Sequence, residues 1–218
     1  MNAADLLKRY QAGETDFIQM SLQGEDLSEF CLRRANLKGA DLSETNLSAA
    51  NLQGVNLTQA TLKAATLWRT DLNRACLAWV NCTQAVLVRA NLTFANLHQA
   101  RFMKTDLRLA NLRGADLGQA DFAGADLRYA DLRDTNLKGT DLSKANLTGA
   151  NLSGVTLCDT LLANAILSRT DLSHSDLSTI SMEGVDLRYA NLIGAHLPES
   201  ALNIQPAPKR ELSMSSRG

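Results

Sequence analysis

The chain contains 218 residues, of which 45% are hydrophobic and 21% are charged, and its formal net charge is -1. This composition allows a sizeable core and gives no overall attraction to nucleic acid or to an anionic membrane. It also argues against a strongly acidic mimic of DNA. Because no long apolar run and no apolar leader occur, the sequence predicts a cytoplasmic protein without a membrane span.

Residues 1–14 carry the signals of a short capping helix. Asn2 is a favourable N-cap residue with Asp5 three positions later, and Gly13 suits the end of a helix. The apolar residues of this segment fall on one helical stripe: Ala3, Leu6, Leu7 and Tyr10. We expect this amphipathic helix to cover the first layer of the structure that follows.

Residues 15–202 repeat with a period of five. From Phe17 to Leu202 every fifth residue is apolar, and 33 of these 38 positions are Leu. A small residue, usually Ala, stands two positions earlier, and Asp or Asn directly precedes the apolar residue in 25 of the 38 repeats. The unit is therefore Ala-(Asp/Asn)-Leu-x-x, as in residues 115–119 and 145–149.

A period of five excludes one continuous helix or one straight strand. Five residues turn an α-helix by about 140° and bring a strand to its opposite face, so neither keeps the leucines on one side. The chain must turn a corner in every repeat, with Leu and the small residue inward and the other three positions outward. Coils of such corners stack through β-like hydrogen bonds, and the short Asp and Asn side chains accept from amides that the turns leave unpaired.

The repeat resembles that of pentapeptide-repeat proteins, whose consensus is A(D/N)LXX. The resemblance covers about residues 15–202 and implies an all-β solenoid, a right-handed quadrilateral β-helix with twenty residues per coil, of which about nine coils fit here. The opening Met-Asn followed by Leu-x-x-Tyr-x-Ala-Gly is similar to cyanobacterial members of the family, among them a regulator of heterocyst differentiation. This similarity implies a regulatory role through a protein partner such as a transcriptional regulator.

Residues 203–218 lose the repeat and turn polar. Pro206 and Pro208 interrupt extended pairing in this segment. The sequence therefore predicts a flexible C-terminal tail.

The sequence contains no constellation that predicts a catalytic, cofactor-binding or metal site. His98, His174 and His196 occupy outward positions without a His or Cys partner at ligand spacing. The glycines that end several repeats are explained by turn geometry, and the four scattered cysteines are expected to be reduced and to pack as small hydrophobes. We therefore predict a protein that is not an enzyme and needs no cofactor.

One side of the predicted coil carries an unusual column of arginines and large apolar residues. With twenty residues per coil, the two residues after each Leu on this side stack in two files. The column consists of Trp68, Arg69, Arg89, Arg108, Leu109, Arg128 and Tyr129. Because Arg and aromatic residues are enriched at protein interfaces, we predict that it binds an acidic or mixed protein surface. A solubilising face with incidental aromatics stays open as an alternative.

Three functions stay open at this point. The first is a regulatory protein-interaction module, either a monomer or a weak dimer. The second is the family's gyrase-interacting role, in which an acidic rod mimics DNA, although this sequence lacks the expected columns of outward carboxylates. The third is a single-stranded nucleic-acid binder that uses the basic and stacking groups of the column, which the neutral overall charge disfavours.

Overall fold

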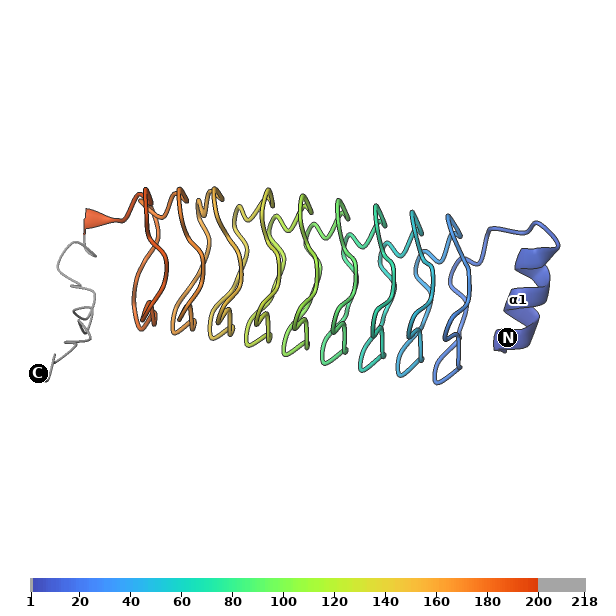
Figure 1. The fold of residues 1–218 in the computed structure, drawn as a ribbon. Helices are drawn as coiled ribbons and strands as arrows, with labels where there is room; N and C mark the ends of the chain where they lie inside the picture. Colours follow the sequence, from blue (N-terminus) through green and yellow to red (C-terminus); the bar gives the residue numbers. More distant parts are fainter. Residues whose placement is uncertain (1, 200–218) are drawn as a thin grey trace, which may run out of the picture.

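The structure, a computed structural model, describes residues 2–199 and consists of stacked coils preceded by one helix. Figure 1 shows the coils following one another as a rod, with α1 at the N-terminal end. Parallel bridges join most residues before the central apolar position to the residue twenty positions later, as in Asp106↔Asp126 and Asp126↔Asn146. The chain thus forms a right-handed quadrilateral β-helix with twenty residues per coil, as predicted.

Backbone hydrogen bonds hold neighbouring coils together on each side. The amide of Leu107 donates to the carbonyl of Asp126 at 2.7 Å, and the amide of Asp126 donates to the carbonyl of Thr105 at 2.9 Å. A third bond joins the Leu109 amide to the Arg128 carbonyl at 2.9 Å. Each pentapeptide is therefore bonded to the coil on either side of it, so stability accumulates between neighbours along the stack.

The core consists of the apolar and small positions of each repeat. Leu107 is fully buried and Ala110 is 1% exposed, and this pattern recurs from coil to coil. On one side the central positions hold Cys82, Phe102 and Phe122 in succession, and the two phenyl rings stack 4.9 Å apart at an angle of 6°. The small Cys82 lies one coil before the two rings, and burial raises the pKa of its thiol. The other three cysteines face outward, so the expectation that all four pack as small hydrophobes is wrong for them.

Asp and Asn before the central Leu bond to the backbone, as predicted. Their Oδ1 atom accepts from the amide two residues later, at 3.0 Å for Asp41 with Ser43 and 3.2 Å for Asn51 with Gln53. An Asn in this position also donates from Nδ2 to the same position one coil earlier, at 2.7 Å for Asn136 with Asp116. The side chains therefore form ladders along the rod as well as turns within a coil.

Threonine replaces alanine at several buried small positions without leaving its hydroxyl unpaired. The Thr70 hydroxyl donates to the carbonyl of Leu47 at 2.7 Å, and Thr140 makes the equivalent bond to Leu117 at 2.7 Å. Within residues 2–199, every buried side-chain nitrogen or oxygen has a hydrogen-bond partner. The narrow interior therefore tolerates this polar group because the neighbouring coil supplies an acceptor.

Helix α1, Ala3–Gln11, covers the first coil. The Asn2 side chain accepts from the Asp5 amide at 2.8 Å, which is the predicted N-cap, and Leu6 is fully buried. The Tyr10 hydroxyl donates to the Arg33 carbonyl at 3.0 Å. The helix thus shields an otherwise open edge of the coil. The predicted tail, 203–218, lies outside the described residues.

From Gln19 to Gly194, the second residue after each central position except Thr179 adopts a left-handed backbone conformation, whether or not it is glycine. Twenty-five non-glycine residues have positive φ, including Arg89 at 59° and Tyr129 at 59°. Such residues cost about 1–2 kcal/mol each, which the regular stack offsets. Turn geometry alone therefore does not explain why some of these positions hold glycine. At Gly114 and Gly149 there is a second reason, because the rings of Phe94 and Tyr129, from the preceding coil, lie where a side chain would stand.

Candidate functional site: an outer face of the rod

The structure brings the seven predicted column residues together in two adjacent files. Backbone bonds place Arg69 beside Val88, Arg89 beside Arg108 and Leu109 beside Arg128, at 3.0, 3.0 and 2.9 Å. One file runs through Arg69, Arg89, Leu109 and Tyr129, and the other through Trp68, Val88, Arg108 and Arg128. The seven residues therefore form one continuous surface over four coils, which we call the column.

Two of the four arginines in the column are neutralised within their own repeats. Arg108 makes a two-pronged contact with the carboxylate of Asp106, with Nε 2.9 Å from Oδ1 and Nη2 2.7 Å from Oδ2. Arg128 contacts Asp126 in the same way, at 2.8 and 2.6 Å. The Arg108 Nε also lies 3.8 Å from Asp126. The column is therefore less cationic than its sequence indicated, because the balancing carboxylates precede each Leu rather than follow it.

The pKa values of these paired groups shift in both directions. The pKa of Arg108 and of Arg128 is raised, chiefly by the hydrogen bonds to Asp106 and Asp126. Burial raises the pKa of Asp106, but the bonds from Arg108 and the charge of Arg128 outweigh it, so the net shift is downward. The Arg108–Asp106 pair thus stays ionised and closed at neutral pH.

The apolar members of the column are exposed. Trp68, Leu109 and Tyr129 all point outward, and the Arg69 guanidinium lies 5.1 Å from the centre of the Trp68 ring. Arg89 forms no ion pair with any residue in the range 2–199. A surface of this kind combines flat apolar area with fixed planar donors, which are features of protein interfaces.

Other sides of the rod carry exposed aromatics that sequence analysis did not single out. Trp79 stands edge-on to His98, with ring centres 6.4 Å apart, and its indole nitrogen donates to Gln99. Phe94 stacks with the Arg74 guanidinium, 5.9 Å from the ring centre. Both residues occupy the second position after Leu, and sorting that position by side would have revealed them. The column is thus one of several apolar surfaces on the rod.

Two kinds of feature are absent from the described part of the chain, residues 2–199. Among residues 2–199 no group of three His, Cys, Asp or Glu side chains could hold a metal ion. The same residues include no helix long and apolar enough to cross a membrane.

The fold and its outward files define a solenoid repeat protein. The chain belongs to the pentapeptide-repeat family. The model of this family, described as pentapeptide repeats, matches the chain in eight copies, which together span residues 13–48, 31–69, 40–78, 70–108, 105–143, 140–179 and 165–203. No curated protein matches the chain.

Solved structures of pentapeptide-repeat proteins resemble this one. HetL of the cyanobacterium Nostoc sp. strain PCC 7120, involved in heterocyst differentiation regulation, is 32% identical, with 90% of this chain and 94% of HetL covered and a TM-score of 0.71. QnrB1, a plasmid-mediated fluoroquinolone resistance protein, is 16% identical over 79% of this chain and 93% of its own, with a TM-score of 0.43. A protein of the Arabidopsis thaliana thylakoid lumen is 33% identical over 45% of this chain and 65% of its own, with a TM-score of 0.30.

Proposed function

We propose that the protein is a non-enzymatic regulatory interaction module of the cytoplasm, which binds a protein partner through the column. The observation that carries the proposal is the continuous exposure of Trp68, Leu109 and Tyr129 beside closed Arg–Asp pairs. Apolar area flanked by fixed ion pairs fits a mixed protein surface, because the partner gains buried area without having to neutralise every arginine. The similarity to HetL, a protein of differentiation regulation, supports a regulatory role.

The test is a cross-linking pull-down that compares the wild type with Trp68→Ala/Tyr129→Ala. The matched control is Trp79→Ala/Leu161→Ala, which removes large apolar side chains of similar exposure (52% and 56% against 42% and 57%) from other sides of the rod. We expect the column variant to lose a partner that the control keeps. Charge reversal at both Arg108 and Arg128 is a poorer test, since it would place four acidic side chains together and disturb the fold.

The two other functions predict different results. A gyrase-interacting protein would inhibit or protect gyrase in a supercoiling assay, and we expect no effect at micromolar protein. A single-stranded nucleic-acid binder would bind a labelled oligonucleotide with strong salt dependence. We expect only weak binding, because the carboxylates of Asp106 and Asp126 already hold two of the column's arginines.

A further inference from the structure

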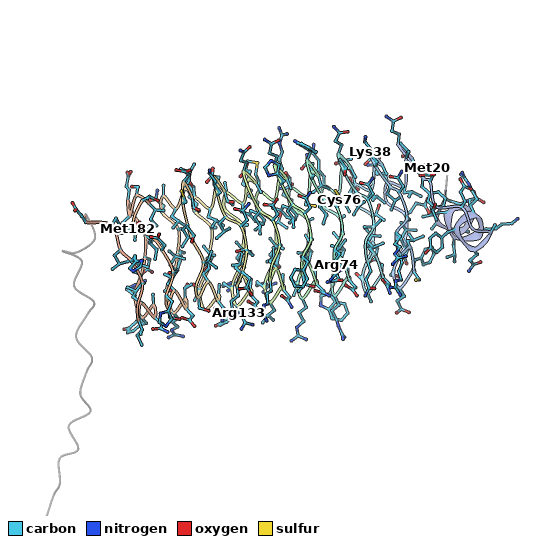
Figure 2. All side chains as sticks on the ribbon, turned by 90° about the horizontal axis from the view of Figure 1, so that it is seen from above. Met20, Lys38, Arg74, Cys76, Arg133 and Met182 are labelled. Carbon is cyan, nitrogen blue, oxygen red and sulfur yellow. The ribbon has the colours of Figure 1, made fainter. Side chains whose placement is uncertain are left out.

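A shallow hollow on a different side of the rod is lined by three arginines. It has a volume of about 140 Å³ and spans three successive coils near the N-terminal end. Its lining residues are Arg33, Arg34, Gln53, Gly54, Asn73 and Arg74. Backbone bonds at 2.9 Å, from Arg34 to Gln53 and from Gly54 to Asn73, fix the order of the coils. Figure 2 places the labelled Arg74 in the N-terminal half of the rod, away from Arg133.

The three arginines differ from the paired arginines for a reason that lies in the repeat. In the paired cases, Asp directly precedes the central Leu and Arg directly follows the same Leu, so the guanidinium folds back onto the carboxylate. In the repeat of Asp131 and Arg133, for example, Nη2 of Arg133 lies 2.7 Å from Oδ2 of Asp131. Arg33 directly follows Leu, but Cys31 stands where the Asp would be. Arg34 and Arg74 occupy the next position, from which side chains lean toward the following coil. Within residues 2–199, none of the three forms an ion pair.

Gly54 keeps the middle of the hollow open. It lies between the coils of Arg34 and Arg74, and the Arg34 side chain extends over it, with Cγ 3.5 Å from where a Cβ would stand. The position does not require glycine, because Gln59 adopts the same conformation with φ 61°. The absence of a side chain at 54 therefore creates the space that the arginines border.

The surroundings hold the hollow in shape and leave it positive. Arg74 stacks on the ring of Phe94, which fixes the guanidinium plane while leaving its N–H edges available. Asp71, bonded to the lining residue Gln53, also accepts from Asn91 and from the Asn73 amide. The donors to Asp71 thus satisfy its carboxylate, and the described lining of the hollow contains three arginines and no acidic residue.

We propose that this hollow binds a phosphate group. A phosphate carries close to two negative charges at neutral pH and offers three terminal oxygens, so it can accept from several guanidinium groups at once. A carboxylate has one charge and two oxygens, so it matches three arginines less well. The phosphate can come from free inorganic phosphate or from a phosphorylated side chain of another protein.

The experiment is a titration of the folded protein with inorganic phosphate at constant ionic strength, following the arginine Nε–Hε signals by NMR. We expect the signals of Arg33, Arg34 and Arg74 to shift together, while Arg133 stays unchanged. Acetate at the same ionic strength should leave all of them in place. Equal shifts with acetate, or shifts spread over all arginines, would overturn the site.

Two variants separate a built site from general positive charge. Arg34→Gln/Arg74→Gln should weaken phosphate binding by about tenfold, because hydrogen bonds between charged groups are stronger than those between neutral groups. Its matched control, Arg101→Gln/Arg169→Gln, removes two exposed arginines that lie outside both the hollow and the column, and should have no effect. Gly54→Gln keeps every charge but fills the hollow, and should also weaken binding. Equal affinity in all of these variants would contradict the proposal.

A further comparison identifies the source of the phosphate. A short phosphoserine peptide and its unphosphorylated form are titrated in the same way. Tighter binding of the phosphopeptide than of inorganic phosphate would assign the hollow to a phosphorylated protein segment, and equal affinity would assign it to the free ion. Binding of the unphosphorylated peptide with the same affinity would refute a phosphate site.

Discussion

The ring of Tyr129 lies against Gly149, twenty residues later and one coil further along the rod. A Cβ on Gly149 would stand 2.6 Å from Cε1 of the ring, which is closer than side chains pack. Phe94 and Gly114 repeat the arrangement, at 2.5 Å from Cε1. An outward aromatic therefore needs a glycine in the next coil when its ring extends along the rod. This relationship links surface residues that lie far apart in sequence.

Gly149→Ala should destabilise the protein more than Gly154→Ala. Both glycines have a left-handed backbone, at φ 70° and 72°, so alanine meets the same backbone cost of about 1 kcal/mol at each. Only Gly149 contacts a ring, which must also move. We expect an additional loss of about 1 kcal/mol in urea unfolding, since off-rotamer side chains cost about that much.

The Tyr129→Ala/Gly149→Ala pair provides the control. Removing the ring should cancel the additional cost, which a double-mutant cycle would measure as a coupling energy. Equal destabilisation by the two glycine substitutions would show that the ring moves without cost.

The protein should lose stability in acid. The Arg133 hydrogen bond lowers the pKa of Asp131, and the Arg188 hydrogen bond lowers that of Asp186. Because these folded pKa values lie below the unfolded value, their stabilisation is complete above about pH 4 and is lost as pH falls through the folded pKa. We expect a thermal midpoint that is flat from pH 7 to about pH 5 and falls below about pH 4.

Asp131→Asn/Asp186→Asn tests the origin of this acid dependence. The variant keeps the acceptors for the turn amides but takes up two fewer protons on unfolding in acid. Its midpoint should therefore fall less steeply below about pH 4 than that of the wild type. Parallel curves would mean that other carboxylates dominate.

Ala110→Leu should be strongly destabilising, whereas Ala64→Leu should be tolerated. Ala110 is 1% exposed in the narrow interior, and extra methylene groups there cost about 1–3 kcal/mol. Ala64 is exposed with φ 54°, and Leu109 already occupies the equivalent position at φ 60°. Thermal unfolding would compare the two, and similar midpoints would argue against a tightly packed interior.

Leu6→Ala should loosen the first coil without affecting the middle of the rod. Leu6 is the fully buried residue of α1, and truncating a buried leucine costs about 2–5 kcal/mol. Because each coil contacts only its neighbours, hydrogen exchange should accelerate at Phe17, Leu22 and Leu27 but not at Leu117. Lys8→Ala, on the exposed side of the helix, is the control. Uniformly faster exchange would indicate one cooperative unit.

The inward pattern could be predicted because it depends on a local period. The positions represented by Leu107 and Ala110 recur as buried positions from coil to coil, because the apolar period of five repeats along the chain. Asn2 likewise forms the expected N-cap. The column residues could also be grouped, once twenty residues were assigned to each coil. The burial pattern needs only the spacing along the chain, whereas the grouping of the column also needs the twenty residues per coil that the family resemblance implied.

The chemistry of the surface could not be predicted in the same way. Arg108 looked like a free cation, but its guanidinium closes on Asp106, a residue interpreted only as part of the turn. Arg33, Arg34 and Arg74 lie on one side without attracting notice, because they lack the regular spacing of the column. Trp79 and Phe94 were missed for the same reason.

The sequence by itself determined that the chain turns a corner in every repeat and buries two of its five positions, since no straight element can keep an apolar period of five on one side. Tertiary structure alone decided which outward groups neutralise each other and which remain available. The reason is physical: burial follows from repeat position, whereas side-chain pairing depends on the direction in which each side chain leans between coils. Tyr129 reaching Gly149 and Arg34 extending over Gly54 are both results of that direction.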